Sequence, residues 1–145
     1  MSDSRAAFEA WIEAFNAHDE AAIRALTADD SVFEGPGGVH LEGGDASTQY
    51  AMAWLNAFSD ARMDVEHVVV DGDWVAMTGV FKGTHDGTLS GPAGDVSPTG
   101  RRLEGRCSQI VRFENGKAVE ENLYYDQMDV ITQLGLMPET AGAHA

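Results

Sequence analysis

The sequence contains one cysteine, no long hydrophobic run and few basic residues, and each shortage excludes a class of protein. With Cys107 as the only cysteine, no disulfide can form within the chain. No stretch of about 18 apolar residues occurs, and residues 1–10 lack the apolar segment of a secretion signal. We therefore expect a cytoplasmic protein that does not enter a membrane.

Nine Lys and Arg residues oppose 24 Asp and Glu residues, which gives a formal net charge of −15 at pH 7. A field of this sign repels phosphate backbones and anionic lipids, so we expect neither a nucleic-acid partner nor a membrane partner. The 145 residues are 43% hydrophobic and 23% charged, which is typical of one folded domain. We predict a single domain over residues 1–145, with its core at about 8–136 and a loose tail at 139–145.

Motifs for metal binding, nucleotide binding and covalent catalysis are missing as well. The histidines show no HExxH, HxH or Cys-His spacing. No glycine-rich loop leads from a strand into a helix, and no GxSxG motif occurs. The two lysines lie at the outward parity of a strand (Lys82) and in a hairpin turn (Lys117), where Schiff-base chemistry is not expected. We expect no cofactor and no metal, which leaves general acid/base chemistry.

Apolar spacing predicts helices in the first part of the chain. The first helix carries an apolar stripe at i, i+3, i+4 and i+7, formed by Phe8, Trp11, Ile12 and Phe15. Residues 20–26 predict a short second helix, and residues 31–34 a short strand. A third helix is predicted after the glycine pair at 43–44, with Asp45 as its N-cap.

The rest of the chain has the alternating pattern of strands. Residues 63–70 and 74–85 predict one hairpin, and residues 101–113 and 118–126 flank an Asn-Gly pair that predicts another. A last helix is predicted at 127–134. Helices followed by strands indicate an α+β fold, in which a cone-shaped, curved antiparallel or mixed sheet wraps on the N-terminal helices. The mouth of such a cone can hold a small molecule.

Asp126 is the carboxylate that we expect to carry the acid/base chemistry. It ends the strand at 118–126, whose alternate residues Asn122, Tyr124 and Asp126 would present an amide, a phenol and a carboxyl on one face. A carboxyl in an apolar pocket has a pKa shifted toward neutrality, as proton transfer requires. Asp126 could equally cap the last helix, and one residue can do both.

Further candidate residues lie on neighbouring elements. His85 ends the strand at 74–85 on the parity of its apolar residues, so it would point into the mouth of the cone or simply belong to the next loop. Gln109 shares the parity of Cys107 and could donate to a substrate carbonyl or satisfy backbone groups. Candidates for substrate contact are Gln109, Cys107, Tyr50, Trp54, Phe58, Asn122 and Tyr124. The aromatic residues of the third helix are also typical core residues.

Several segments resemble successive signatures of the SnoaL-like polyketide cyclase family. These segments are residues 83–87, 98–101 and 111–117. Residues 120–126, followed by Gln-Leu-Gly at 133–135, resemble the closing pattern of the family. The opening helices resemble those of the nuclear transport factor 2-like superfamily at Trp11, Asn16, Asp19 and Leu26.

The resemblance implies a cone-shaped domain that pairs as a homodimer through the outer face of its sheet and needs no cofactor. It also implies that Asp126 is the general acid/base of an intramolecular aldol closure. On chemical grounds, a neutral His85 or Gln109 could then donate a hydrogen bond to the enolate oxygen. Two positions depart from the family, which commonly has tryptophan where this chain has Asn122 and often has histidine where it has Glu121. We therefore expect a pocket that is more polar than usual, and a different substrate.

The resemblance does not fix the reaction, because this fold also hosts hydroxylases, isomerases, dehydratases, epoxide hydrolases and binding modules. A limonene-type epoxide hydrolase needs an Arg-x-Asp pair at the end of a strand, whereas Arg62 and Asp64 begin one. A ketosteroid isomerase needs an aspartate where this chain has Gly35. We predict a polyketide cyclase-like enzyme for a small, apolar, oxygenated substrate. The alternative is a ligand-binding module without turnover.

Overall fold

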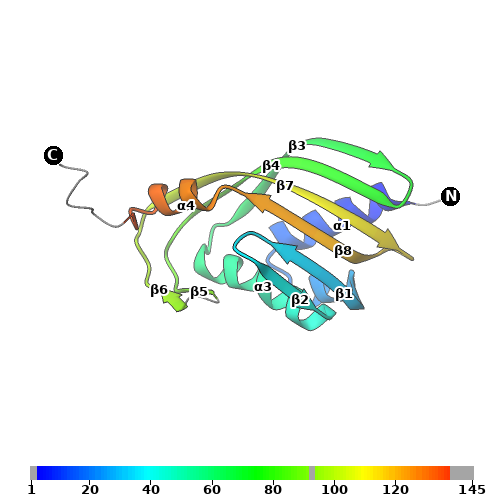
Figure 1. The fold of residues 1–145 in the computed structure, drawn as a ribbon, viewed down its shortest axis with the longest axis horizontal. Helices are drawn as coiled ribbons and strands as arrows, with labels where there is room; N and C mark the ends of the chain where they lie inside the picture. The colour runs from blue at the N-terminus through cyan, green and yellow to red at the C-terminus, as the bar shows by residue number, and fades with distance from the viewer. Residues whose placement is uncertain (1–2, 92–93, 138–145) are drawn as a thin grey trace.

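The computed structural model describes residues 3–91 and 94–137 (Figure 1). The predicted tail at 139–145 lies outside these residues. The helices in this part of the chain are α1 (Ser4–Asn16), α2 (Glu20–Ala25), α3 (Gly44–Ala57) and α4 (Gln127–Gln133). None of the helices within the described ranges is long and apolar enough to cross a bilayer.

Six strands form the main sheet, in the order β2-β1-β8-β7-β4-β3. Their bounds are β1 (Thr27–Gly35), β2 (Val39–Glu42), β3 (Arg62–Asp71), β4 (Trp74–Thr84), β7 (Arg102–Glu114) and β8 (Lys117–Tyr125). The pair β1–β8 is parallel and the other neighbouring pairs are antiparallel. A separate small hairpin consists of β5 (Leu89–Gly91) and β6 (Gly94–Val96).

The sheet curves over α1 and α3, which lie on its concave face (Figure 1). Register shifts in β1–β8, β3–β4 and β7–β8 help to bend the strands, because a bulge increases local twist and curvature. The predicted α+β architecture with a curved, mixed sheet is thus confirmed.

The core lies between these helices and the inner face of the sheet. The apolar stripe of α1 is buried there, with Phe8 2%, Trp11 8% and Phe15 5% exposed. Alternate residues of β4 point to the same side, so Val75 and Met77 are buried. Spacing of 3.6 and 2.0 residues therefore predicted the inward faces of α1 and β4 correctly.

Two local predictions were wrong. β1 begins at Thr27, four residues earlier than expected, and the Thr27 hydroxyl donates to the carbonyl of Ile23 at 2.8 Å. Asp45 lies in the first turn of α3, whose N-cap is Gly43 at φ 100°. The carboxylate of Asp45 instead pairs with Arg24.

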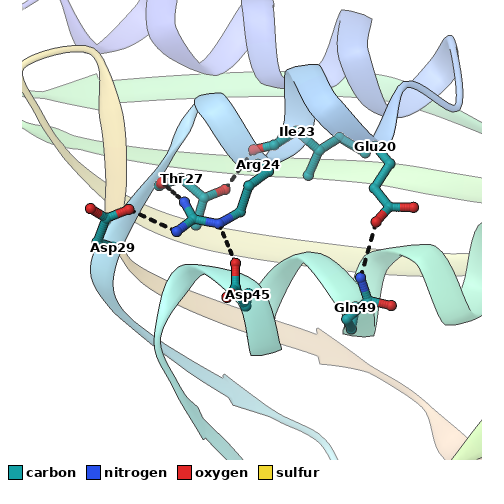
Figure 2. A network of polar contacts seen from close by, with 7 residues as sticks. All are labelled: Glu20, Ile23, Arg24, Thr27, Asp29, Asp45 and Gln49. Carbon is teal, nitrogen blue, oxygen red and sulfur yellow. Dashed lines mark hydrogen bonds and ion pairs between the residues drawn. The ribbon is translucent and has the colours of Figure 1, made fainter.

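The Arg24 side chain connects α2 to β1 and to α3 (Figure 2). Its guanidinium donates to the Asp45 carboxylate on α3 at 2.7 Å, to the Asp29 carboxylate on β1 at 2.7 Å and to the Thr27 carbonyl at 3.0 Å. Arg24 lowers the pKa of Asp29 through this hydrogen bond and its charge. The network fixes the N-terminal end of the helix that supplies much of the cavity wall described below.

Candidate functional site

A cavity of about 80 Å³ lies between the helices and the concave face of the sheet. Its wall is rich in aromatic side chains. The helices contribute Trp11, Phe15, Tyr50 and Trp54, and the strands contribute Phe33, Phe81 and Tyr125. Ser47, Gln109 and Glu121 add polar side chains to this apolar wall, which is typical of a site for a small organic molecule.

Helical and strand periodicity explain which residues reach the cavity. Ser47, Tyr50, Ala51 and Trp54 occur at i, i+3, i+4 and i+7 and share one face of α3. Strand β7 contributes Leu103, Gly105, Cys107 and Gln109, which have the same parity. Strand β8 contributes the alternate residues Glu121, Leu123 and Tyr125.

Glu121 is the carboxylate of the cavity wall. It is 7% exposed, and the Ser47 hydroxyl donates a hydrogen bond to its Oε2. Burial raises the pKa of Glu121, while the hydrogen bond from Ser47 opposes this rise more weakly. Within the described residues Oε1 accepts no hydrogen bond, so the carboxyl keeps one oxygen for a ligand. A buried carboxyl of this kind releases its proton at a higher pH than an exposed glutamate, which suits it to acid/base chemistry.

The predicted face of β8 was wrong by one residue. Asn122 and Tyr124 have the outward parity, opposite to that of Glu121. Asn122 borders the cavity, but its side-chain amide donates to the Ile110 carbonyl at 3.1 Å. Tyr124 is 56% exposed and lines a shallow outer groove with Leu123 and Tyr125, which also line the cavity.

Asp126 is the N-cap of α4, which is one of the two roles predicted for it. Its carboxylate accepts a hydrogen bond from the Asp129 backbone N–H at 3.1 Å. Asp126 is exposed and is not part of the cavity wall. The apolar surroundings on which its predicted catalytic role depended are therefore absent. Asp126 contributes to the site indirectly, because α4 places Val130 in the cavity wall.

His85 and Phe58 lie behind the cavity wall rather than in it. His85 is fully buried, and its ring stacks on Phe58 with centroids 5.2 Å apart. Its Nδ1 accepts a hydrogen bond from the Thr99 backbone N–H, so the neutral ring carries its proton on Nε2. Burial lowers the pKa of His85, which favours this neutral form. Phe58 is also fully buried and packs against Trp54 and Phe81, as a core residue does.

The structure places Gln109, Cys107, Tyr50 and Trp54 in the cavity wall, where the sequence predicted them. Burial raises the pKa of Cys107 to about 11, so its thiol is protonated at neutral pH and is a poor nucleophile. Burial also raises the pKa of Tyr125, and the neighbouring phenol of Tyr50 raises it further. These neutral groups can donate hydrogen bonds but do not add charge.

The sequence analysis did not identify Glu121, Ser47 or Tyr125 as site residues. The signal was Leu123, an apolar residue in the second half of β8, because a strand that turns Leu123 inward also turns residues 121 and 125 inward. The prediction started from Asp126 and therefore selected the opposite face of β8. Arg62 and Asp64 form an exposed pair on β3 at 2.8 Å, outside the cavity wall, so they do not supply an epoxide hydrolase site.

No three His, Cys, Asp or Glu side chains within residues 3–91 and 94–137 group closely enough to hold a metal ion. Polar side chains of the cavity wall could contact an organic ligand instead, and they include Ser47, Tyr50, Gln109, Glu121 and Tyr125.

Known structures share this fold. AclR from Streptomyces galilaeus, named as a hydroxylase, is 24% identical with a TM-score of 0.78 over 99% of this chain and 92% of its own. A SnoaL-like polyketide cyclase, so named, from Jannaschia sp. CCS1 is 19% identical with a TM-score of 0.81 over 93% of each chain. IdmH from Streptomyces antibioticus, named as a polyketide cyclase, is 27% identical with a TM-score of 0.76 over 92% of this chain and 99% of its own.

Among curated protein sequences, none matches this chain significantly. The sequence pattern of SnoaL-like polyketide cyclases, in contrast, matches residues 5–134, which include every element from α2 to α4 and nearly all of α1. The chain therefore belongs to the SnoaL-like polyketide cyclase family.

Proposed function

We propose that this protein is a cofactor-independent acid/base enzyme that closes a ring in a small, apolar, polyketide-like ester by an intramolecular aldol-type step. The observation that carries the proposal is the position of Glu121, a carboxyl enclosed in an aromatic cavity with one oxygen free for a ligand. The family and the cyclase names of two structural neighbours support the reaction type.

In this reaction Glu121 would move a proton between two atoms of one substrate. As a carboxylate, its Oε1 takes an acidic proton from the carbon between two carbonyl groups. The enolate carbon then forms a bond with a second carbonyl carbon of the same molecule. The alkoxide that results takes the proton back from Glu121 and becomes a hydroxyl. No other reactant is consumed, so the product is an isomer of the substrate.

Other wall residues would stabilise charge on the substrate. The Gln109 amide and the phenols of Tyr50 and Tyr125 are neutral donors that can bind the enolate oxygen as negative charge develops there. Ser47 would hold the carboxyl in one orientation through its hydrogen bond to Oε2. The aromatic wall excludes water and strengthens these interactions.

Asp126 and His85 have indirect roles in this proposal. Asp126 stabilises α4 as its N-cap, and His85 connects the end of β4 to the backbone at Thr99. Asn is as good an N-cap as Asp, so Asp126→Asn should keep most of the activity. Complete loss of turnover in Asp126→Asn would instead return the catalytic role to Asp126.

The proposal can be tested by mass spectrometry of the protein incubated with a panel of polyketide-like esters. We expect at least one ester to be converted into an isomer with a new ring, or into a product lighter by one water. Glu121→Gln should bind the same ester without converting it. If every ester that binds the wild-type protein remains unchanged, the protein is a binding module and the proposal is wrong.

A further inference from the structure

The cavity wall contains a buried acid but no basic side chain. None of the described residues that line the cavity is Lys, Arg or His. The other titratable groups of the wall are Tyr50 on α3, Cys107 on β7 and Tyr125 on β8. These groups are neutral when protonated and cannot become cations. Ser47, a neutral donor, is the hydrogen-bond partner of the Glu121 carboxyl. Buried carboxylates usually have a cationic partner, so the charge of Glu121 lacks its usual compensation.

Aromatic rings from both layers of the fold line the same cavity as this carboxyl. Trp54 is nearly perpendicular to Phe81 and to Tyr125, and the ring centroids of both pairs are 5.6 Å apart. On the β1 side, Phe33 and Tyr50 are 4.5 Å apart. Aromatic faces attract a cation within about 6 Å of the ring centroid, and most strongly where water is excluded. A cavity of this composition suits a ligand with an apolar surface and a positive centre.

We infer that the cavity binds small organic ammonium ions, with Glu121 as the counter-charge and the aromatic rings as a cage. The net charge of −15 favours the approach of cations to the protein. Anionic ligands are disfavoured, because the described wall contains no basic side chain and the Glu121 carboxylate would repel them. The inference goes beyond the proposed function, which concerns a neutral ester, although both use Glu121.

Binding of a permanent cation should depend on pH in a defined direction. Without a ligand, burial raises the pKa of Glu121, so its carboxyl takes up a proton at a higher pH than an exposed glutamate does. A bound quaternary ammonium ion stabilises the carboxylate, and binding then releases a proton. Below the pKa of Glu121 in the ligand-free protein, the affinity for the cation should therefore fall about tenfold for each unit by which the pH is lowered. Above that pKa the affinity should be constant.

Choline and 3,3-dimethyl-1-butanol provide a matched pair of probes, because they have nearly the same shape and differ in the positive charge. We expect calorimetric titration of the whole protein at pH 8 to give about tenfold tighter binding of choline. Glu121→Gln should abolish this preference. Glu120→Gln removes the same charge from the adjacent outward position, where Glu120 pairs with Arg112, and should retain it.

A second variant keeps the inference open to refutation if Glu121→Gln does not fold. Trp54→Leu removes one ring of the cage and should weaken the binding of choline more than that of the alcohol. Equal or tighter binding of the alcohol by the wild-type protein overturns the inference, as does a choline preference that survives Glu121→Gln. These titrations need no turnover, so ester conversion without choline binding refutes only this inference, and the reverse result refutes only the proposed function.

Discussion

The Ser47 hydroxyl on α3 donates a hydrogen bond to the Glu121 carboxyl on β8, across 74 positions of the sequence. The contact joins the helical layer to the sheet at the wall of the cavity. It also satisfies one oxygen of a carboxyl that is almost entirely buried, while the other oxygen is left for a ligand. A surface glutamate would have neither the pKa that burial raises nor the orientation that the hydrogen bond from Ser47 fixes.

The pH dependence of turnover should reflect the environment of Glu121. Burial raises its pKa above the ordinary value of 4.5, and the proposed reaction begins from the carboxylate. The value of kcat/KM should therefore fall on the acid side, about tenfold per pH unit, with a midpoint above 4.5. Stopped assays between pH 4 and pH 9, with circular dichroism at each pH to verify folding, measure this limb. A midpoint at or below 4.5 would contradict the assignment.

Replacement of Phe58 should mainly lower stability, whereas replacement of Trp54 should mainly weaken substrate binding. Phe58 is fully buried behind the wall, so Phe58→Leu should lower the free energy of unfolding by about 1–2 kcal/mol and leave KM nearly unchanged. Trp54 lines the cavity, so Trp54→Leu should raise KM. Urea denaturation and steady-state kinetics of both variants separate the effects. A larger rise in KM for Phe58→Leu than for Trp54→Leu would place Phe58 in contact with the substrate.

Arg24 should stabilise the fold through its position between α2, β1 and α3 (Figure 2). Arg24→Met removes both ion pairs and should lower the Tm by about 2–4 °C, and less at high salt because salt screens exposed charges. Arg5→Met is the matched control, since Arg5 makes a single exposed contact of 3.8 Å with Glu9. Thermal unfolding monitored by circular dichroism tests the difference, and an equal Tm for the two variants would refute it.

The outer face of the sheet is the proposed dimer interface. Ile110 and Tyr124 lie on this face on adjacent strands, 39% and 56% exposed. We expect sedimentation equilibrium to give a dimer at micromolar concentration, and Ile110→Lys to weaken association by about tenfold or more, because a charge would replace an apolar contact. Ala21→Lys on the exposed side of α2 is the control. A monomeric wild-type protein would exclude this interface.

Local spacing predicted most of the fold, because an amphipathic pattern is set by neighbouring residues. The stripe of α1 and the alternation of β4 gave the correct inward faces, and the Asn-Gly pair gave the turn between β7 and β8, where Asn115 and Gly116 have φ 52° and 77°. The parallel pairing of β1 with β8 was not predicted strand by strand, because it joins segments about 90 residues apart and leaves no local pattern.

The candidate site was predicted less completely than the fold. Asp126 attracted the catalytic assignment because an aspartate after a strand fits both a cap and an acid, and only its surroundings separate the two. The structure shows that Asp126 is the N-cap of α4. Glu121 is buried in the cavity wall, where its partner Ser47 and the aromatic side chains come from distant parts of the chain. A charged residue in a strand ordinarily predicts the solvent face, so Glu121 did not suggest a buried site residue, and the face of β8 was chosen from Asp126 instead of from Leu123.

The central claim is that Glu121 moves the proton, and the most direct measurement is the turnover of three matched variants on one converted ester. Glu121→Gln should lower kcat at least about 10³-fold while the ester still binds, because Gln cannot accept the proton. Glu120→Gln and Asp126→Asn, one on the outer face and one at the cap of α4, should stay within about threefold of the wild-type rate. Full activity in Glu121→Gln, or its loss in Asp126→Asn alone, would contradict the account.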